Sequence, residues 1–162
     1  MQISIDEREA SARSYFTRGY NCCQSVLLAF KDVLDLPEEK AAALGSGFGG
    51  GFGRLREVCG AVSGMTFVAG AISPAADPLK HDERTANYAL VQKMALKFKE
   101  RNGSIICREL LGLRAQEKQS PEPQERTAAY YHTRPCEAMV GTAARIIAEE
   151  LAAAVNCPAE KE

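Results

Sequence analysis

Residues 58–76 read VCGAVSGMTFVAGAISPAA and contain no charged side chain. A membrane-spanning helix needs about 20 mostly apolar residues, whereas this stretch is rich in glycine, serine and threonine and has few large aliphatic side chains. We therefore expect a helix from about Glu57 to Ile72 that is buried near the centre of a helical bundle, and we expect no membrane insertion. The proline-containing break at 73–78 ends this helix.

The chain on both sides of this stretch is predicted to form further helices separated by short breaks. Asn21 is a favourable N-terminal cap, and Pro37 suits the first position of a helix. The spacing of Tyr88, Val91, Met94, Ala95 and Phe98 is typical of a core-facing helix surface. The predicted additional helices cover about residues 6–18, 21–34, 81–101, 104–111 and 135–155, with one more beginning at 37.

No segment shows a sustained alternation of apolar and polar residues, so no sheet is predicted. The sequence predicts an all-α fold, a single-domain helical bundle of about six to seven helices. The domain is expected to cover residues 1–162, with a core of about 6–155 and a tail at 156–162. The polar, proline-containing segment 114–126 is predicted to be a mobile loop.

Composition excludes several classes of function. The 162 residues carry a formal net charge of −1 and form no basic stripe, so nucleic acid is not an expected partner.

The first ten residues lack the basic and apolar regions of a secretory signal, and the cytoplasm is the expected location. Structural disulfides are uncommon there, and clustered cysteines more often serve metal or redox chemistry.

Four cysteines each fall where a helix is expected to begin. The first turn of a helix carries unpaired N–H groups and the positive end of the dipole. A thiol in that position ionises more easily, and the thiolate is the form that attacks disulfides or binds metal. We expect these residues to converge at one site, although buried cysteines that act only as small apolar side chains are the alternative. The four are Cys22, Cys59, Cys107 and Cys136.

Two further cysteines and one histidine receive lesser roles. Cys23 projects about 100° away from Cys22 on the same helix, so we expect it to pack in the core, and Cys157 lies in the tail. His132 precedes Cys136 by four residues, which would suit a ligand or a proton donor, but an exposed loop histidine is the favoured interpretation.

Residues 45–53 read GSGFGGGFG and predict a permissive loop. They contain one G-x-G-x-x-G match, but a dinucleotide site needs a preceding strand, and residues 41–44 are predicted to be helical. We instead expect this backbone to pass close to the cysteines and to offer N–H donors to a thiolate or cluster sulfur. The glycines predicted to bind a cofactor in this way are Gly49, Gly50, Gly51 and Gly60.

Several of these segments together resemble the C_GCAxxG_C_C family, which is described as redox-active. The matching residues are GYNC at 19–22, GFGGG at 47–51, CGAVSG at 59–64, CRELLG at 107–112 and Cys136. The resemblance covers about residues 12–150. It implies that the four family cysteines are Cys22, Cys59, Cys107 and Cys136, and it supports a redox role without indicating a substrate.

These observations predict that the four cysteines are catalytic and carry electrons. They would do so by reversible disulfide formation or as the metal ligands of an iron–sulfur cluster. A redox partner protein is then expected. One alternative is a non-catalytic module in which four thiolates hold zinc, and another is a helical oligomerisation domain with structural cysteines. A homodimer would suit the glycine- and alanine-rich helix.

Overall fold

The computed structural model describes residues 4–114 and 117–156 of the chain. Within those residues the protein contains eight α-helices, six of which have seven or more residues, so the predicted all-α fold is confirmed. They are α1 (Ile5–Thr17), α2 (Cys22–Ala29), α3 (Glu38–Gly45), α4 (Gly60–Ile72), α5 (His81–Asn102), α6 (Cys107–Leu110), α7 (Ala128–Thr133) and α8 (Cys136–Asn156), with a 3-10 turn, η1, at Ser46–Phe48.

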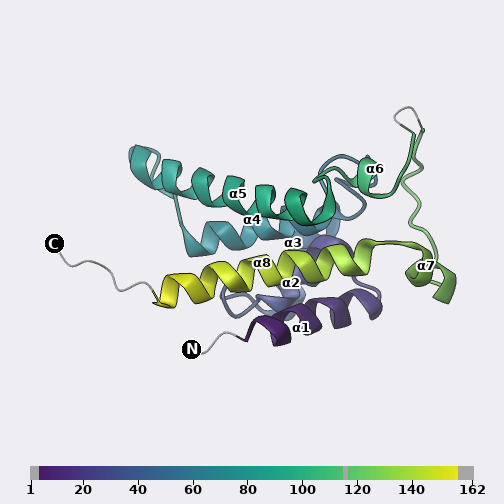
Figure 1. Ribbon diagram of the computed structural model, residues 1–162, viewed down its shortest axis with the longest axis horizontal. Coiled ribbons are helices and arrows are strands. Elements are labelled where there is room, and N and C mark those ends of the chain that lie inside the picture. Colours follow the sequence, from purple (N-terminus) through teal and green to yellow (C-terminus); the bar gives the residue numbers. More distant parts are fainter. Residues whose placement is uncertain (1–3, 115–116, 157–162) are drawn as a thin grey trace.

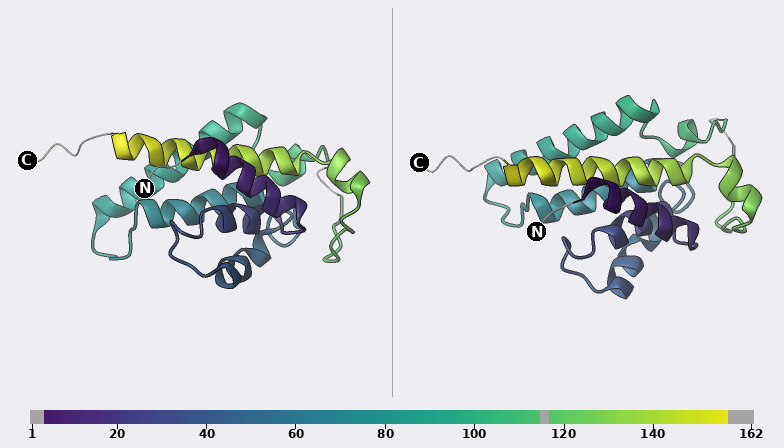
Figure 2. Two further views of the ribbon diagram at one scale, coloured as in Figure 1. Left: turned by 90° about the horizontal axis from the view of Figure 1, so that it is seen from below. Right: turned by 60° about the horizontal axis from the view of Figure 1, so that its bottom comes forward.

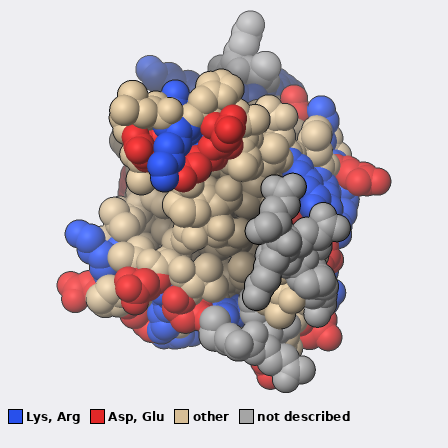
Figure 3. Space-filling view, turned by 90° about the vertical axis from the view of Figure 1, so that its left-hand side faces the viewer, with Lys and Arg blue, Asp and Glu red and all other residues tan. Residues whose placement is uncertain are grey.

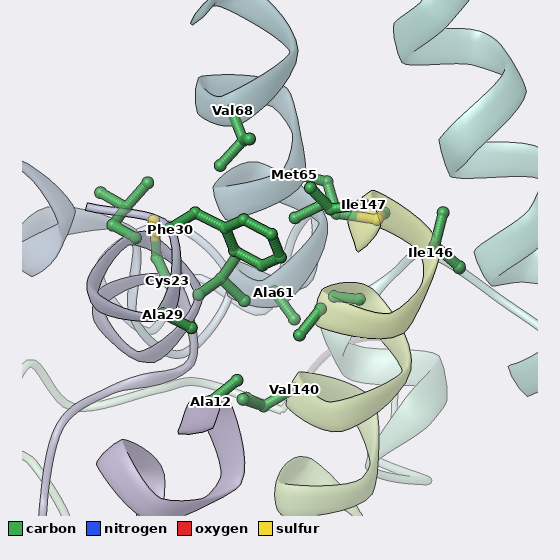
Figure 4. Close-up of a cluster of buried hydrophobic side chains, with 14 of the residues drawn as sticks. Ala12, Cys23, Ala29, Phe30, Ala61, Met65, Val68, Val140, Ile146 and Ile147 are labelled. Atoms are coloured by element: carbon green, nitrogen blue, oxygen red, sulfur yellow. The ribbon is translucent and has the colours of Figure 1, made fainter. Parts of the chain in front are cut away.

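Helices α2 and α8 form the centre of the bundle. Helix α8 contacts α1, α2, α4 and α5, and α2 contacts α1, α3, α4 and α8 (Figure 1). The α8 face that carries Val140, Ile146 and Ile147 packs with Phe30 and Met65 in one buried cluster (Figure 4). Burial of this continuous apolar surface provides the main driving force for folding.

Two glycines allow α4 to lie directly against α2. A Cβ atom on Gly64 would be 2.7 Å from the Cβ of Val26, and one on Gly60 would be 3.1 Å from the Cβ of Cys22. Both distances are too short for a side chain to fit without movement of its neighbours. Small residues four apart on α4 therefore set the close approach of the two helices, and this approach places the start of α4 beside the start of α2.

Tertiary contacts shorten two of the predicted helices. Helix α2 ends at Ala29 rather than near residue 34, because the Arg8 side chain donates a hydrogen bond to the Ala29 carbonyl at 2.6 Å and pairs with Asp32. Helix α4 begins at Gly60 rather than at Glu57. The residues just before it are held by an isolated antiparallel bridge to residue 106, the only β-type pairing in the part of the chain that the structure describes.

Two other expectations were wrong or incomplete. Tyr88 was expected in the core-facing stripe of α5, but it is 60% exposed, whereas Met94 and Phe98 of the same stripe are buried. Helix α7 was not predicted. It begins at Ala128 because the Thr127 hydroxyl accepts a hydrogen bond from the backbone N–H of Tyr130, which is the usual role of an N-cap threonine.

The starts of α6 and α8 and the whole of α7 lie at the same end of the molecule (Figures 1 and 2). The opposite end, where α4 ends and α5 begins, presents a mostly uncharged centre bordered by side chains of both charges (Figure 3). Across residues 4–114 and 117–156, no helix combines the length and apolar character needed to cross a membrane.

Candidate functional site

Each of the four predicted cysteines lies at a helix start. Cys22, Cys107 and Cys136 are the first residues of α2, α6 and α8, and Cys59 immediately precedes α4. The start of α2 is fixed by reciprocal hydrogen bonds: Gln24 N–H donates to Asn21 Oδ1 and Asn21 N–H donates to Gln24 Oε1, both at 2.9 Å. This capping box fixes the Cys22 backbone at the first position of the helix.

Backbone hydrogen bonds bring Cys59 and Cys107 together although 47 intervening residues separate them. The Cys59 N–H donates to the Ile105 carbonyl at 2.8 Å, and the Cys107 N–H donates to the Glu57 carbonyl at 2.6 Å. Val58 and Ile106 form the bridge between these two bonds. The start of α6 is thereby attached to the segment that leads into α4.

All four cysteines line one small cavity of about 40 Å³. Gly50, Gly51 and Gly60 also line it, whereas Gly49 lies outside it and packs against Asn21. The five described cysteines are free thiols. The tertiary structure therefore gathers the four helix-start cysteines beside the glycine loop, as the sequence analysis expected.

The contribution of the glycine loop to this cavity is steric. Gly51 has φ +71°, and a Cβ atom there would be 2.5 Å from the Cβ of Cys107. The predicted hydrogen bonds from loop glycines to a cysteine sulfur are absent among the described residues. Instead, the Gly50 and Gly51 carbonyls accept hydrogen bonds from the N–H groups of Arg56 and Glu57 and fold the loop back on itself.

Cys22 and Cys136 form a thiol pair at the more accessible side of the cavity, where both residues are half-buried. Hydrogen bonding from the Cys22 thiol, together with the positive charges of Arg134 and Arg126, outweighs burial and lowers the pKa of Cys136 to about 7. The same contact raises the pKa of Cys22 well above its usual value, and burial and the neighbouring cysteines add to this increase. These opposite shifts favour the thiolate form at Cys136 over that at Cys22.

Cys59 and Cys107 are deeper and less ionisable. Cys59 is 5% exposed and Cys107 is 8% exposed. Burial raises the pKa of Cys59 to about 12 despite the opposing effect of the Ala61 and Val62 N–H groups. Burial also raises the pKa of Cys107, against the opposing effect of Arg56, whose Nη1 donates to the Cys107 sulfur at 3.8 Å. At neutral pH these two residues are thiols rather than thiolates.

The remaining cysteines and histidines lie outside the cavity. Cys23 is fully buried in the hydrophobic core (Figure 4), and burial raises its pKa to about 12. His132, on α7, and His81, at the start of α5, are exposed and do not line the cavity. Cys157 lies outside the described residues.

The sequence analysis missed the basic and aromatic side chains that cover the cysteines. Arg56, Arg126, Tyr130 and Arg134 all line the cysteine cavity. Two of them carried a signal in the sequence: Arg56 stands three residues before Cys59, and Arg134 stands two before Cys136. A basic residue beside a helix-start cysteine favours the thiolate. Arg126 belongs to the segment that was expected to be only a mobile loop.

The arrangement of the sulfurs does not fit a metal centre. A four-thiolate zinc site and an iron–sulfur cluster both need several sulfurs directed at one centre. Among the residues described, no group of three or more His, Cys, Asp or Glu side chains is placed so that it could hold a metal ion. Within the site, Cys22 has the largest effect on the pKa of Cys136, and Cys136 has the largest effect on the pKa of Cys22.

Residues 20–150 match a family model described as "Putative redox-active protein (C_GCAxxG_C_C)". No curated protein and no solved structure matches the chain.

Proposed function

Because the chain belongs to the C_GCAxxG_C_C redox-active family, we propose that it acts by thiol–disulfide exchange with Cys22 and Cys136 as the reacting pair. The observation that carries this proposal is that Cys22 and Cys136 line the same cavity and are its two more accessible cysteines. The Cys22 thiol and the nearby arginines also lower the pKa of Cys136 to about 7. A thiol with a pKa near the ambient pH is the most effective attacking group in this exchange.

Accessibility also supports this choice of pair. Cys22 and Cys136 are half-buried, whereas Cys59 and Cys107 are buried. A substrate disulfide must approach the attacking sulfur directly, so exposure limits which cysteine reacts first. Cys136 meets both requirements, since it is the more acidic thiol and belongs to the more accessible pair.

The reaction proceeds in two balanced steps. The Cys136 thiolate attacks one sulfur of a substrate disulfide, which forms a mixed disulfide and releases one substrate thiolate that takes up a proton. The Cys22 thiol then loses its proton and attacks the Cys136 sulfur, which releases the second substrate thiol. Two electrons and two protons pass from the protein to the substrate, and a Cys22–Cys136 disulfide remains in the protein.

Cys59 and Cys107 remain thiols in this sequence and contribute to the low-dielectric floor of the site. A redox partner protein with its own dithiol would reduce the Cys22–Cys136 disulfide and complete the cycle. The proposal includes a cytoplasmic location, because a reducing compartment keeps such thiols free between turnovers.

The test uses protein purified without oxygen and then treated with a small disulfide. We expect loss of two thiols per chain, a mass lower by two hydrogen atoms, and a linked pair of peptides containing Cys22 and Cys136. Cys136→Ser should abolish the change, and Cys23→Ala is the matched control because Cys23 neighbours Cys22 but lies outside the cavity.

Metal analysis and an absorption spectrum of the same preparation separate the alternatives. Iron with visible absorption, or stoichiometric zinc, together with no oxidisable Cys22–Cys136 pair would overturn the proposal in favour of a metal site. Cysteines that react only after unfolding would instead indicate a structural role.

A further inference from the structure

A second, larger cavity of about 390 Å³ adjoins the cysteine cavity. Three arginines, Arg56, Arg126 and Arg134, line both cavities, and Arg54 lines only the larger one. Among the residues that the structure describes, no aspartate, glutamate or lysine lines either of them. The size is within the range of small-molecule sites, and four guanidinium groups give the walls a positive charge.

The four cavity arginines differ from several other arginines of the described chain in their partners. Among the described residues, none of the four forms an ion pair with a carboxylate, whereas Arg8, Arg13, Arg101 and Arg145 each do. The cavity arginines donate to neutral acceptors instead. These are the Glu122 carbonyl for Arg54, the Gln119 side chain for Arg56, the Tyr20 carbonyl for Arg126 and the Gln124 side chain for Arg134.

Within residues 4–114 and 117–156, two buried guanidinium nitrogens have no hydrogen-bond partner. They are Nε of Arg54 and Nη1 of Arg126. Burial and repulsion from Arg56 and Arg134 lower the pKa of Arg54, although the exposed Glu122 carboxylate acts weakly in the opposite direction. Buried donors in folded proteins are nearly always hydrogen-bonded, so an acceptor brought by a ligand would satisfy these two nitrogens. An arginine fork matches a carboxylate or a similar planar oxyanion.

Resting on the thiol–disulfide function above, we propose that this arginine cavity binds the carboxylate end of a small anionic disulfide and holds it against the Cys22–Cys136 pair. The shared arginines link the two cavities, so a ligand anchored in the larger one extends toward the sulfurs. The disulfide receives two electrons and two protons from the pair and leaves as two carboxylate-bearing thiols, while the protein retains a Cys22–Cys136 disulfide. The cavity thereby selects substrates by charge.

The first experiment compares three disulfides of similar size and different charge. Dithiodipropionate is anionic, 2-hydroxyethyl disulfide is neutral and cystamine is cationic. Each rate of protein oxidation is divided by the rate with dithiothreitol, which corrects for intrinsic reactivity. We expect a preference for the anionic compound over the neutral one of about tenfold, in line with one or two charge-assisted hydrogen bonds. This preference should decrease as salt is raised. Equal corrected rates for the three compounds would overturn the proposal.

The second experiment changes Arg54, which lines only the larger cavity. Arg54→Gln should reduce the anionic-over-neutral preference several-fold, and Arg54→Lys should recover part of it. Arg84→Gln is the control, because Arg84 is exposed and lies outside both cavities. Should Arg54→Gln not fold, the salt series on the unaltered protein decides the question. A preference unaffected by both salt and Arg54 would contradict the proposal.

The third experiment separates this inference from the proposed function. Thiodipropionate carries the same two carboxylates but has a thioether in place of the disulfide, so its binding, measured by calorimetry, needs no thiol chemistry. Binding without reduction of dithiodipropionate would reject the exchange reaction and retain an anion site. Reduction without any charge preference would retain the exchange reaction and reject this site. Sulfate that binds as tightly as thiodipropionate would identify the ligand as a free oxyanion and overturn the substrate class.

Discussion

Gly51 lies against Cys107 so closely that a Cβ atom at position 51 would be 2.5 Å from the Cβ of Cys107 and 2.9 Å from the backbone nitrogen of Glu57. The same glycine has φ +71°, a conformation that other residues adopt only at a cost in free energy. The position of one cysteine in the site therefore depends on the absence of a side chain in the loop.

Replacing Gly51 should test this dependence. Gly51→Ala is expected to lower the free energy of unfolding by about 2–4 kcal/mol, because it adds both backbone strain and a steric overlap. Urea denaturation measures the change. Gly47→Ala is the matched control, since a Cβ there meets nothing within 4 Å, and it should change stability by less than about 0.5 kcal/mol. Equal effects of the two substitutions would contradict the steric account of the loop.

The reactivity of Cys136 should follow its lowered pKa. Since the thiolate is present above a pH of about 7, the rate of alkylation by iodoacetamide should rise through a midpoint near that pH. Arg134→Gln removes one of the charges that stabilise the thiolate, so the midpoint should move upward and the rate at pH 7 should fall roughly two- to threefold. Peptide mass spectrometry measures the rate at Cys136 alone. Arg84→Gln should leave the profile in place, and an unshifted midpoint in Arg134→Gln would show that Arg134 does not act on this sulfur.

Alkaline pH should destabilise the protein through Cys23. Burial raises the pKa of this thiol from 9.0 to about 12 in the folded state, so the unfolded chain releases this proton at lower pH than the folded chain does. The associated stability is fully present below pH 9 and is lost as the pH rises toward 12, with a limit of about 4 kcal/mol. Urea denaturation at pH 8, 9.5 and 11 should show a shallower decline in Cys23→Ala than in the unaltered protein. Parallel declines would indicate that Cys23 ionises as easily in the folded state as in the unfolded one.

Glu150 should add to the apolar packing that attaches helix α5 to α8. This carboxylate is 8% exposed and pairs with Lys93 at 2.7 Å and Lys97 at 2.6 Å. Glu150→Gln should lower the free energy of unfolding by about 1–2 kcal/mol, because it removes two charge-assisted hydrogen bonds while both lysines can return to solvent. Glu149→Gln, which alters the more exposed pair with Arg101, is the control and should cost less than about 0.5 kcal/mol. Thermal unfolding distinguishes the two variants, and a larger effect at position 149 would refute this assignment.

Local sequence signals predicted helices well where a cap or a breaker residue specifies the end. Asn21 and Gly103 mark such boundaries, and the structure places the start of α2 and the end of α5 beside them. The same signals failed where a distant side chain or an isolated β-bridge decides where a helix begins or ends. Arg8 terminates α2 from another helix, and the bridge to Ile106 delays the start of α4. A hydrogen bond between residues far apart in the chain leaves no recognisable pattern in the sequence around either residue.

The amino-acid sequence by itself determined the helical class and the positions of the four cysteines at helix starts, because both depend on interactions within a few residues. The glycines at positions 60 and 64 are visible in the sequence, but the structure was needed to show that helix α2 is the element that approaches them. Only the tertiary structure decided that Cys22 and Cys136 share one cavity with three arginines, none of which has a carboxylate partner among the described residues. These relationships depend on how α7 and α8 return to the start of α2, and this packing is set by burial of apolar surface across the whole bundle.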